Sequence, residues 1–383
     1  MLPASRTQHP APPLRLGVFL PNWVGDVVMA TPALRALRKR VGPSGTLVGI
    51  MRPYVADVLA GGDWFDETIV YAKQPDRPGW SGRAAIRKLR AAELDCVVLL
   101  TNSARTAWMA WRSGARERIG YAGQMRSLLL TKRLSNSSRF ATNNRRLPTI
   151  DSYLLLTEAA GCKSESPRLE LATTPADEQA ADAVWRQLGL SADEPVVVLN
   201  PGGAFGVAKH WPSEYFAALA TRIVFEQELR VLVHCGPSER QVAREIVDRA
   251  TDPRVVGLAG VEELPIGLAK ACIRRSRLLV TTDSGPRFLG VAFGKPVVTL
   301  FGPTDPRMTD THYDRETRLS LALDCQPCME RTCPLGHHRC MRELSVDRVY
   351  GAVVHGLQGD DALPIVTELT SPLAIVKSKA VAR

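Results

Sequence analysis

The chain alternates between short apolar runs and longer segments in which apolar positions recur every three or four residues. A short continuous apolar run is typical of a buried strand, and a period near 3.6 is typical of a helix. In the first half the predicted strands cover residues 14–20, 45–51, 67–72 and 94–100. The predicted helices between them cover residues 25–41, 54–61 and 81–92. Strands and helices in this order predict a parallel sheet with crossover helices.

The same alternation begins again in the second half of the chain. The predicted strands there cover residues 195–200, 229–236, 253–260, 277–285 and 296–302. Segments of helical length separate them, and no sequence repeat relates the two halves. Two successive units of this kind predict an α/β protein with two Rossmann-like domains, whose parallel sheets face a central cleft.

Three segments lack a clear period. Residues 123–148 are basic and rich in Ser and Asn, which predicts a long surface loop. Residues 163–176 are polar and contain proline, and we interpret them as the linker between the domains. The last residues, 359–383, predict a loosely held tail. The predicted domains therefore span residues 14–162 and 177–358.

Composition narrows the class of protein. A chain of 383 residues is too long for one ordinary core, so it forms two domains or one large α/β unit. With 45% hydrophobic and 23% charged residues, neither a disordered chain nor a fibre fits. Lys and Arg number 49 against 39 Asp and Glu, a net charge of +10. This excess favours an anionic partner, such as a phosphorylated small molecule, an acidic membrane surface or nucleic acid.

The length of the apolar runs also indicates where in the cell the protein is located. None approaches the roughly 18 to 20 residues that span a bilayer. Prolines interrupt the first 20 residues, and the apolar stretch there is too short for a secretory signal. We therefore expect a cytoplasmic protein, with attachment to a membrane surface left open.

The sequence NWVGD, residues 22–26, lies between the first predicted strand and the first predicted helix. In open α/β sheets, ligands bind just beyond the carboxyl ends of the strands, which is where Asp26 lies. Its carboxylate is one candidate for a functional group. The alternative is that Asp26 caps the helix by accepting hydrogen bonds from backbone N–H groups of the first turn.

A glycine-bearing loop follows the strand at 195–200 and carries Lys209. Glycines let the backbone approach a phosphate closely, and Ser213 is a plausible cap for the helix that follows. The loop matches neither common nucleotide-binding fingerprint. A glycine-rich turn with a solvated lysine is therefore the alternative to a phosphate-binding loop.

A second candidate anion site follows the strand at 277–285, which brings Asp283, Ser284 and Gly285 to its carboxyl end. A helix that begins near Pro286 points its N–H groups and positive dipole end toward any anion there. This arrangement favours a nucleotide diphosphate. The alternative is that Asp283 and Ser284 only cap the helix.

Three motifs together resemble a known family. They are NWVGDVVMATPALRALRK, NPGGAFGVAKHWP and TTDSGPRFLGVAFGKPVVTLFGPTDP. In this order they are similar to the ADP-heptose:lipopolysaccharide heptosyltransferases, glycosyltransferase family nine, and look most like the heptosyltransferase II group. The similarity extends from about residue 15 to about residue 350. It implies the GT-B architecture, which agrees with the two Rossmann-like domains read from the pattern.

The resemblance also implies an activity and its residues. The activity is transfer of heptose from ADP-heptose to the lipopolysaccharide inner core, with inversion at the anomeric carbon. Asp26 stands at the position of the proposed general base, and Lys209 at that of the lysine that offsets charge on the departing diphosphate. The implied donor-binding residues are Gly203, Ala204, Lys209, Asp283, Ser284 and Gly285. The implied acceptor-binding residues are Asn22 and Gly25.

The resemblance further implies partners. These are ADP-heptose, a lipid-anchored core oligosaccharide as acceptor, and the inner face of the inner membrane, with no nucleic acid. No metal is required, because lysine and a helix end take its place. One departure concerns the donor: relatives usually have a histidine where this chain has Phe288, so a contact to the donor sugar is missing or supplied elsewhere.

A cysteine cluster stands apart from these motifs. Its members are Cys325, Cys328, Cys333 and Cys340, with His337 and His338 inside it. Four thiols and two imidazoles are enough ligands for a tetrahedral structural zinc. Reduced cysteines that pack a loop are the second interpretation, and a disulfide is the third.

Two other functions remain open at this level. One keeps the fold but transfers another nucleotide-activated sugar or epimerises a sugar. The other is a non-catalytic nucleotide- or nucleic-acid-binding protein with the cysteine cluster as a zinc module. The sequence shows no recognition helix and no stacked aromatic motif that would support the second function.

Overall fold

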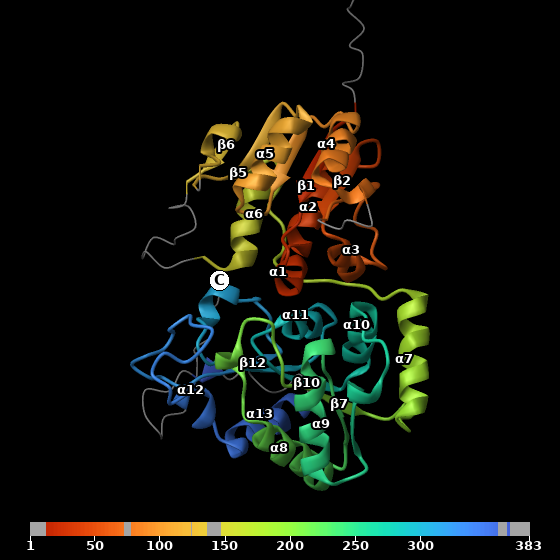
Figure 1. Cartoon of the computed structure of the whole chain (residues 1–383), viewed down its shortest axis with the longest axis vertical. Coiled ribbons are helices and arrows are strands. Elements are labelled where there is room, and N and C mark those ends of the chain that lie inside the picture. Colours follow the sequence, from red (N-terminus) through yellow and green to blue (C-terminus); the bar gives the residue numbers. More distant parts are fainter. Residues whose placement is uncertain (1–12, 73–77, 124, 136–146, 359–365, 368–383) are drawn as a thin grey trace, which may run out of the picture.

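The computed structural model describes residues 13–72, 78–123, 125–135, 147–358 and 366–367. Two α/β units lie one above the other, each built on its own parallel sheet (Figure 1). The first strand of each unit, β1 or β7, lies inside its sheet, and later strands add on either side. The strand order therefore reverses next to β1 and next to β7, which is where open α/β sheets bind ligands.

The first sheet has six strands in the order β3-β2-β1-β4-β5-β6, all parallel. The strands are β1 (Arg15–Phe19), β2 (Thr46–Met51), β3 (Glu67–Val70), β4 (Cys96–Leu99), β5 (Glu117–Tyr121) and β6 (Lys132–Leu134). The helices are α1 (Val24–Met29), α2 (Thr31–Val41), α3 (Pro53–Leu59), α4 (Gly82–Ala91), α5 (Ala104–Ser113) and α6 (Thr149–Ala159). Short 3₁₀ turns lie at η1 (Pro78–Trp80) and η2 (Ser127–Leu129).

The second sheet has seven strands in the order β13-β12-β11-β10-β7-β8-β9, again all parallel. The strands are β7 (Val196–Asn200), β8 (Arg230–Val233), β9 (Val255–Gly257), β10 (Leu278–Thr282), β11 (Val297–Leu300), β12 (Glu316–Leu319) and β13 (Val366–Thr367). The helices are α7 (Pro175–Gln187), α8 (Ser213–Glu226), α9 (Arg240–Ala250), α10 (Ile266–Arg275), α11 (Gly285–Ala292), α12 (Arg339–Arg342) and α13 (Val346–Leu357).

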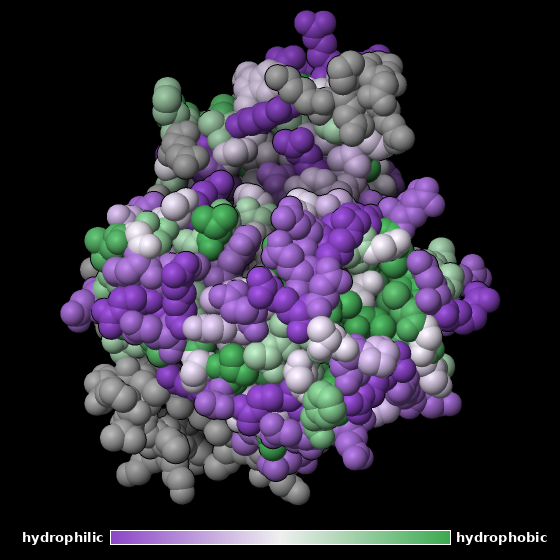
Figure 2. Space-filling model, turned by 60° about the horizontal axis from the view of Figure 1, so that its bottom comes forward, coloured by the Kyte–Doolittle hydropathy of each residue, from purple (hydrophilic) through white to green (hydrophobic). Residues whose placement is uncertain are grey.

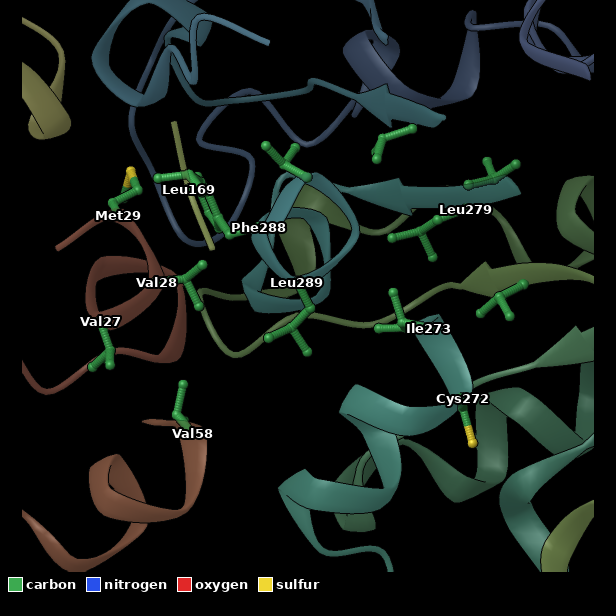
Figure 3. Packing of buried hydrophobic residues seen from close by; sticks show 14 of the residues in the cluster. Val27, Val28, Met29, Val58, Leu169, Cys272, Ile273, Leu279, Phe288 and Leu289 are labelled. Atoms are coloured by element: carbon green, nitrogen blue, oxygen red, sulfur yellow. The ribbon is translucent and has the colours of Figure 1, made fainter. Parts of the chain in front are cut away.

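One continuous apolar core joins the two units. It runs from the α2 and α6 side of the first sheet through α1 and α11 into the second sheet. Figure 3 shows Val28 of α1, Val58 of α3 and Leu289 of α11 among the side chains that meet there. A separate smaller core lies between the first sheet and helices α4 and α5. Apolar packing therefore fixes α1 against α11 and positions the groups that each helix carries.

Several sequence predictions need correction. The predicted helix at 25–41 is divided at Ala30 into α1 and α2. The predicted loop at 123–148 contains η2 and the edge strand β6, because Lys132–Leu134 finds a partner in β5; residues 136–146 lie outside the described residues. Strands β5 and β12 were not predicted. Of the predicted tail, Val366–Thr367 pair with β12, and the rest lies outside the described residues.

The predicted linker contains no helix or strand up to Thr174, which caps α7 through a capping box with Asp177. It packs on the first unit, since Arg35 of α2 donates hydrogen bonds to the carbonyl oxygens of Ser166 and Arg168. Helix α7 then lies beside α10 of the second unit (Figure 1). The domain boundaries at 162 and 177 stay a prediction.

The surface of the second unit is largely hydrophilic where it is seen from below, with hydrophobic residues in small separate groups (Figure 2). This is the ordinary pattern for a surface in contact with water. Within the described ranges, no helix combines the length and the apolar character needed to cross a bilayer.

Candidate active site

A cavity of about 460 Å³ lies between α1 of the first unit and the carboxyl ends of β7, β8 and β10 in the second. Most residues that the sequence singled out line it: Gly25, Asp26, Gly203, Ala204, Lys209, Asp283, Ser284 and Gly285. Asn22 is the exception. It is exposed, does not line the cavity, and accepts a hydrogen bond on its carbonyl oxygen from Tyr54 Oη.

Asp26 lies in the first turn of α1 and faces the cavity. No side chain caps this helix, so the capping alternative for Asp26 is wrong. Burial raises the pKa of Asp26 to about 6, and the negative charge of Asp283 adds to the rise. Near pH 7 the carboxylate is therefore mostly ionised and is a much better proton acceptor than an ordinary aspartate.

Asp283 anchors two cations at the other side of the cavity. Lys209 Nζ lies 2.8 Å from Asp283 Oδ2, and Arg287 Nη1 lies 3.0 Å from Oδ1. Thr304 Oγ1 donates a further hydrogen bond of 2.8 Å to Oδ2. Burial acts to raise the pKa of Asp283, but the charges of Lys209 and Arg287 outweigh it and hold the pKa below its ordinary value. Lys209 is thus a buried, ion-paired side chain, and the alternative of a solvated lysine is wrong.

Arg287 extends this network away from the cavity. Its guanidinium forms two bonds to Glu316 of β12, with Nε 2.5 Å from Oε1 and Nη2 3.1 Å from Oε2. Thr299 and Thr311 also donate to the Glu316 carboxylate, at 2.7 and 2.9 Å. Every member is buried, so the network holds Asp283, and through it Lys209, in a fixed position.

The sequence did not indicate Arg287 or Glu316. Glu316 lies in a strand with a charged sequence that is typical of a surface segment. The available signal was the spacing of Asp283 and Arg287. Asp283 lies just before α11 and Arg287 lies four residues later in its first turn, and the two form an ion pair.

The start of α11 is open toward the cavity. No side chain caps it. Pro286 has no N–H and the Arg287 N–H donates to the Ser284 carbonyl oxygen at 3.2 Å, so the helix presents the Gly285 N–H and its positive dipole end to an anion there. The Ser284 hydroxyl is instead held by Asn200 Nδ2 at 3.2 Å. A Cβ atom on Gly203 would lie 3.0 Å from Ser284 Cβ, so glycine lets the two predicted phosphate-binding segments lie side by side.

Asn200 and His234 also support this arrangement, although the sequence did not indicate a role for them. His234 Nδ1 lies 2.9 Å from Asn200 Oδ1. Burial lowers the pKa of His234 to about 4, so the imidazole is neutral and adds no charge to the site. A buried His after a strand gave no sequence signal beyond its position at the carboxyl end of β8.

The far end of the cavity combines one carboxylate with an apolar wall. Glu239 accepts the Gly236 N–H at 2.8 Å, and its carboxylate packs directly against Gly202. The wall beside it is formed by Leu258, Leu264, Pro265, Ile266 and Leu268. The carboxylate can accept hydrogen bonds from ribose hydroxyls, and the apolar wall can pack against a planar base. This end of the cavity is therefore suited to a nucleoside.

Gly25 and Phe288 form a close contact between the two units. A Cβ atom on Gly25 would lie 2.7 Å from the Phe288 ring, and one on Gly285 would lie 3.2 Å from Val24 Cβ. Phe288 is buried, lines the cavity, and has the Arg287 guanidinium 4.9 Å from its ring centre. At this position the chain therefore has an apolar packing residue.

We expect Gly25→Ala to destabilise the protein by about 1–3 kcal/mol, because the added methyl group has to push α1 away from the Phe288 ring. Urea unfolding monitored by circular dichroism measures this. The matched control is Gly351→Ala in α13, where nothing lies within 4 Å and alanine is the better helix former. Equal unfolding midpoints for the two variants would contradict the prediction. The double variant Gly25→Ala/Phe288→Ala should lose less than the sum of its single changes.

The cysteine cluster lies behind the Lys209 loop. All four cysteines and both histidines line a small cavity of about 20 Å³, and the cysteines are free thiols. His338 Nε2 lies 2.8 Å from the carbonyl oxygen of Ala208, and the Ala208 N–H donates to Arg331. Among the described residues, no group of three or more His, Cys, Asp or Glu is placed to hold a metal ion. The segment thus supports the loop, and the zinc interpretation stays a prediction.

Comparison with known proteins gives consistent matches. Residues 83–339 match the model of glycosyltransferase family 9 (heptosyltransferase). Lipooligosaccharide heptosyltransferase 2 of Campylobacter jejuni is 26% identical over 339 residues, which cover 88% of this chain and 97% of that protein.

Two solved structures from E. coli show the same fold. ADP-heptose lps heptosyltransferase II matches with a TM-score of 0.73 at 22% identity, over 91% of this chain and 100% of that one. Heptosyltransferase WaaC with ADP-2-deoxy-2-fluoro heptose matches with a TM-score of 0.64 at 16% identity, over 89% of this chain and 99% of that one. The predicted α/β fold of GT-B type is confirmed.

Proposed function

Because the chain belongs to glycosyltransferase family 9, the heptosyltransferases, we propose that it transfers heptose from ADP-heptose to the inner core of lipopolysaccharide or lipooligosaccharide. One observation carries the proposal. Asp26 from the first unit and the ion pair of Asp283 and Lys209 from the second line the same cavity, together with an end that is suited to a nucleoside. A proton acceptor and an anion-binding surface therefore face each other across the space for a sugar.

In the proposed mechanism Asp26 is the general base. It accepts the proton of an acceptor hydroxyl while that oxygen attacks the anomeric carbon of the donor sugar. The new carbon–oxygen bond forms as the bond to the diphosphate breaks, and attack from the opposite side inverts the anomeric configuration. Its position in the first unit, across the cavity from the diphosphate-binding groups, supports this role.

The departing diphosphate gains negative charge in this step. We assign it to the positive end of α11 at Ser284 and Gly285 and to the backbone at Gly203 and Ala204, with Lys209 as the cation beside it. The Asp283 oxygens are already occupied by Lys209, Arg287 and Thr304, which makes Asp283 the anchor of the lysine. Direct contact between Asp283 and the donor sugar stays a prediction.

These groups supply positive charge without a metal ion, so we propose that the reaction requires none. Glu239 and the apolar wall are the proposed site of the ADP ribose and base. Gly25 lies beside Asp26 and lines the cavity, so we propose it as a contact of the acceptor sugar. Asn22, being outside the cavity, fits an acceptor contact only at its rim.

The acceptor we propose is lipid-anchored, so the enzyme works in the cytoplasm at the inner face of the inner membrane. A second candidate function, transfer of another nucleotide-activated sugar, is favoured by one observation alone. Phe288 makes the cavity wall apolar at the position where the resemblance to the family implies a histidine. Donor competition between ADP-heptose and other nucleotide sugars separates the two.

The test is ADP release from ADP-heptose with a heptosylated Kdo-lipid A acceptor, with and without EDTA. We expect release that depends on the acceptor and is unchanged by EDTA. No release with ADP-heptose but release with another nucleotide sugar would replace the proposed donor. Loss of release in EDTA, restored by a divalent metal ion, would overturn the metal-free proposal.

The pKa of Asp26 sets the expected pH dependence. The base acts only when ionised, so kcat/KM should rise with pH through about 6 and level off above it, falling to about one-tenth of the plateau at pH 5. Initial rates from pH 5 to pH 8 measure the profile. A kcat/KM that stays level down to pH 5 would show that the Asp26 pKa is not raised in the free enzyme.

A further inference from the structure

We propose that the outward face of helices α4 and α5, with the adjoining segment 125–129, is a docking surface for an anionic lipid bilayer. The two helices lie side by side on one face of the first sheet (Figure 1). Their apolar sides, including Ile86 and Leu89 of α4 and Ala110 of α5, are buried in the smaller core. Their other sides therefore point outward together, and we call this surface the α4–α5 face.

The α4–α5 face is strongly basic. The two helices carry Arg83, Arg87, Lys88, Arg90, Arg105 and Arg112, and neither contains an acidic residue. The first acidic residues after them, Glu93 and Glu117, come beyond the ends of the helices. This concentration of positive charge is complementary to anionic headgroups.

The same face exposes large apolar side chains. Trp108 and Trp111 of α5 are 44% and 47% exposed and lie one turn apart, with the Arg112 guanidinium 5.9 Å from each ring centre. Next to α5, Met125 is 94% and Leu128 is 90% exposed. Exposed tryptophans beside cations are typical of a surface that enters the headgroup region of a membrane.

The direction of the face fits the proposed reaction. The Arg105 guanidinium at the start of α5 lies close to Gly82 at the start of α4, so both helices begin at the same edge of the sheet. That edge is the carboxyl end of β1 and β4, where Asp26 also lies. A bilayer on the α4–α5 face would therefore be near the mouth of the cavity. This part of the inference rests on the proposed lipid-anchored acceptor.

Vesicle flotation tests the charge contribution. Wild type should float with phosphatidylcholine vesicles that contain phosphatidylglycerol, and far less with phosphatidylcholine alone. The variant Arg83→Glu/Arg87→Glu/Lys88→Glu should bind the anionic vesicles about 100-fold more weakly. The matched control, Lys163→Glu/Arg186→Glu/Arg249→Glu, makes the same charge change at exposed positions outside the face and should bind nearly as wild type does.

The aromatic contribution has its own test. Trp108→Ala/Trp111→Ala should weaken binding most clearly in high salt, where electrostatic attraction is screened. Phe225→Ala, an exposed aromatic residue on α8, is the control. Brominated lipid should quench wild-type tryptophan fluorescence, and the quenching should be much smaller in Trp108→Phe/Trp111→Phe.

Equal binding by the charge variant and its control, or equal binding of wild type to both kinds of vesicle, would overturn the proposal. So would binding of wild type to single-stranded nucleic acid with no binding to vesicles. Heptose transfer to a deacylated, water-soluble acceptor should be unchanged in the charge variant. If wild type binds vesicles but transfers no heptose, the proposed function fails while the docking surface stands.

Discussion

Replacing Asp26 by asparagine is expected to lower kcat for heptose transfer by about 10²–10⁴-fold. The amide cannot accept the proton that the acceptor hydroxyl loses, while it has nearly the same size as the carboxylate. Since Asp26 lies across the cavity from the predicted donor site, ADP-heptose should still bind with an affinity near that of wild type. Steady-state rates of ADP release and calorimetric binding of ADP separate these two effects.

Stability gives an independent check on this variant. The folded-state pKa of Asp26, about 6, lies above the ordinary 3.8, so the ionised group opposes folding, and stability falls as pH rises through this window. At pH 7.5 the variant should therefore melt at the same temperature as wild type or higher. The control is Asp63→Asn, an exposed aspartate in the same unit. Unchanged kcat in Asp26→Asn would remove Asp26 from the mechanism.

The second large effect concerns stability. Arg287→Met should destabilise the protein by about 3–5 kcal/mol, because it leaves the buried carboxylates of Asp283 and Glu316 without their shared cation. Urea unfolding at pH 7.5 measures the change in midpoint. Activity should fall as well, since Asp283 loses one of the partners that fix its position beside Lys209.

Two further variants test whether the destabilisation by Arg287→Met comes from the buried carboxylates or from the loss of an arginine as such. In Arg287→Met the buried Glu316 carboxylate keeps only Arg318 as a cation, and Arg287→Met/Glu316→Met removes that carboxylate, so the double variant should be more stable than Arg287→Met. Arg339→Met breaks the exposed pair with Glu343 and should leave the midpoint close to that of wild type. Similar midpoints for Arg287→Met and Arg339→Met would show that the buried network does not contribute to stability.

The two effects have a common structural basis. Asp26 has a raised pKa because its half-buried carboxyl group is poorly solvated, lies near a second carboxylate and, within the described residues, has no cation of its own. Asp283 has a lowered pKa because it holds two cations. Two aspartates in one cavity thus differ in protonation behaviour through their neighbours, which suits one to proton transfer and the other to a fixed structural charge.

Much of the site was predictable because local sequence determines it. Asp26, Ser284 and Gly285 follow strands, and the loop of Gly203 and Lys209 does too, so the strand–helix pattern places all of them at the carboxyl edges of the sheets. Glu239, Asn200 and His234 were missed because their contacts join separate loops of the second unit. The exposed position of Asn22 was also not predictable, since Tyr54, which donates a hydrogen bond to its carbonyl oxygen, lies outside the motif.

The sequence by itself determined the alternation of strands and helices, the two parallel sheets and the turn residues of the cavity. The hydrophobic period and the placement of glycines depend on residues that are close together in the chain. They can therefore be read directly from the sequence. Only the tertiary structure decided that Gly25 packs on Phe288, that Glu316 is buried, and that Lys209 is ion-paired. Those outcomes depend on which distant elements share a buried space, because a charge enters a core only where packing brings it a partner.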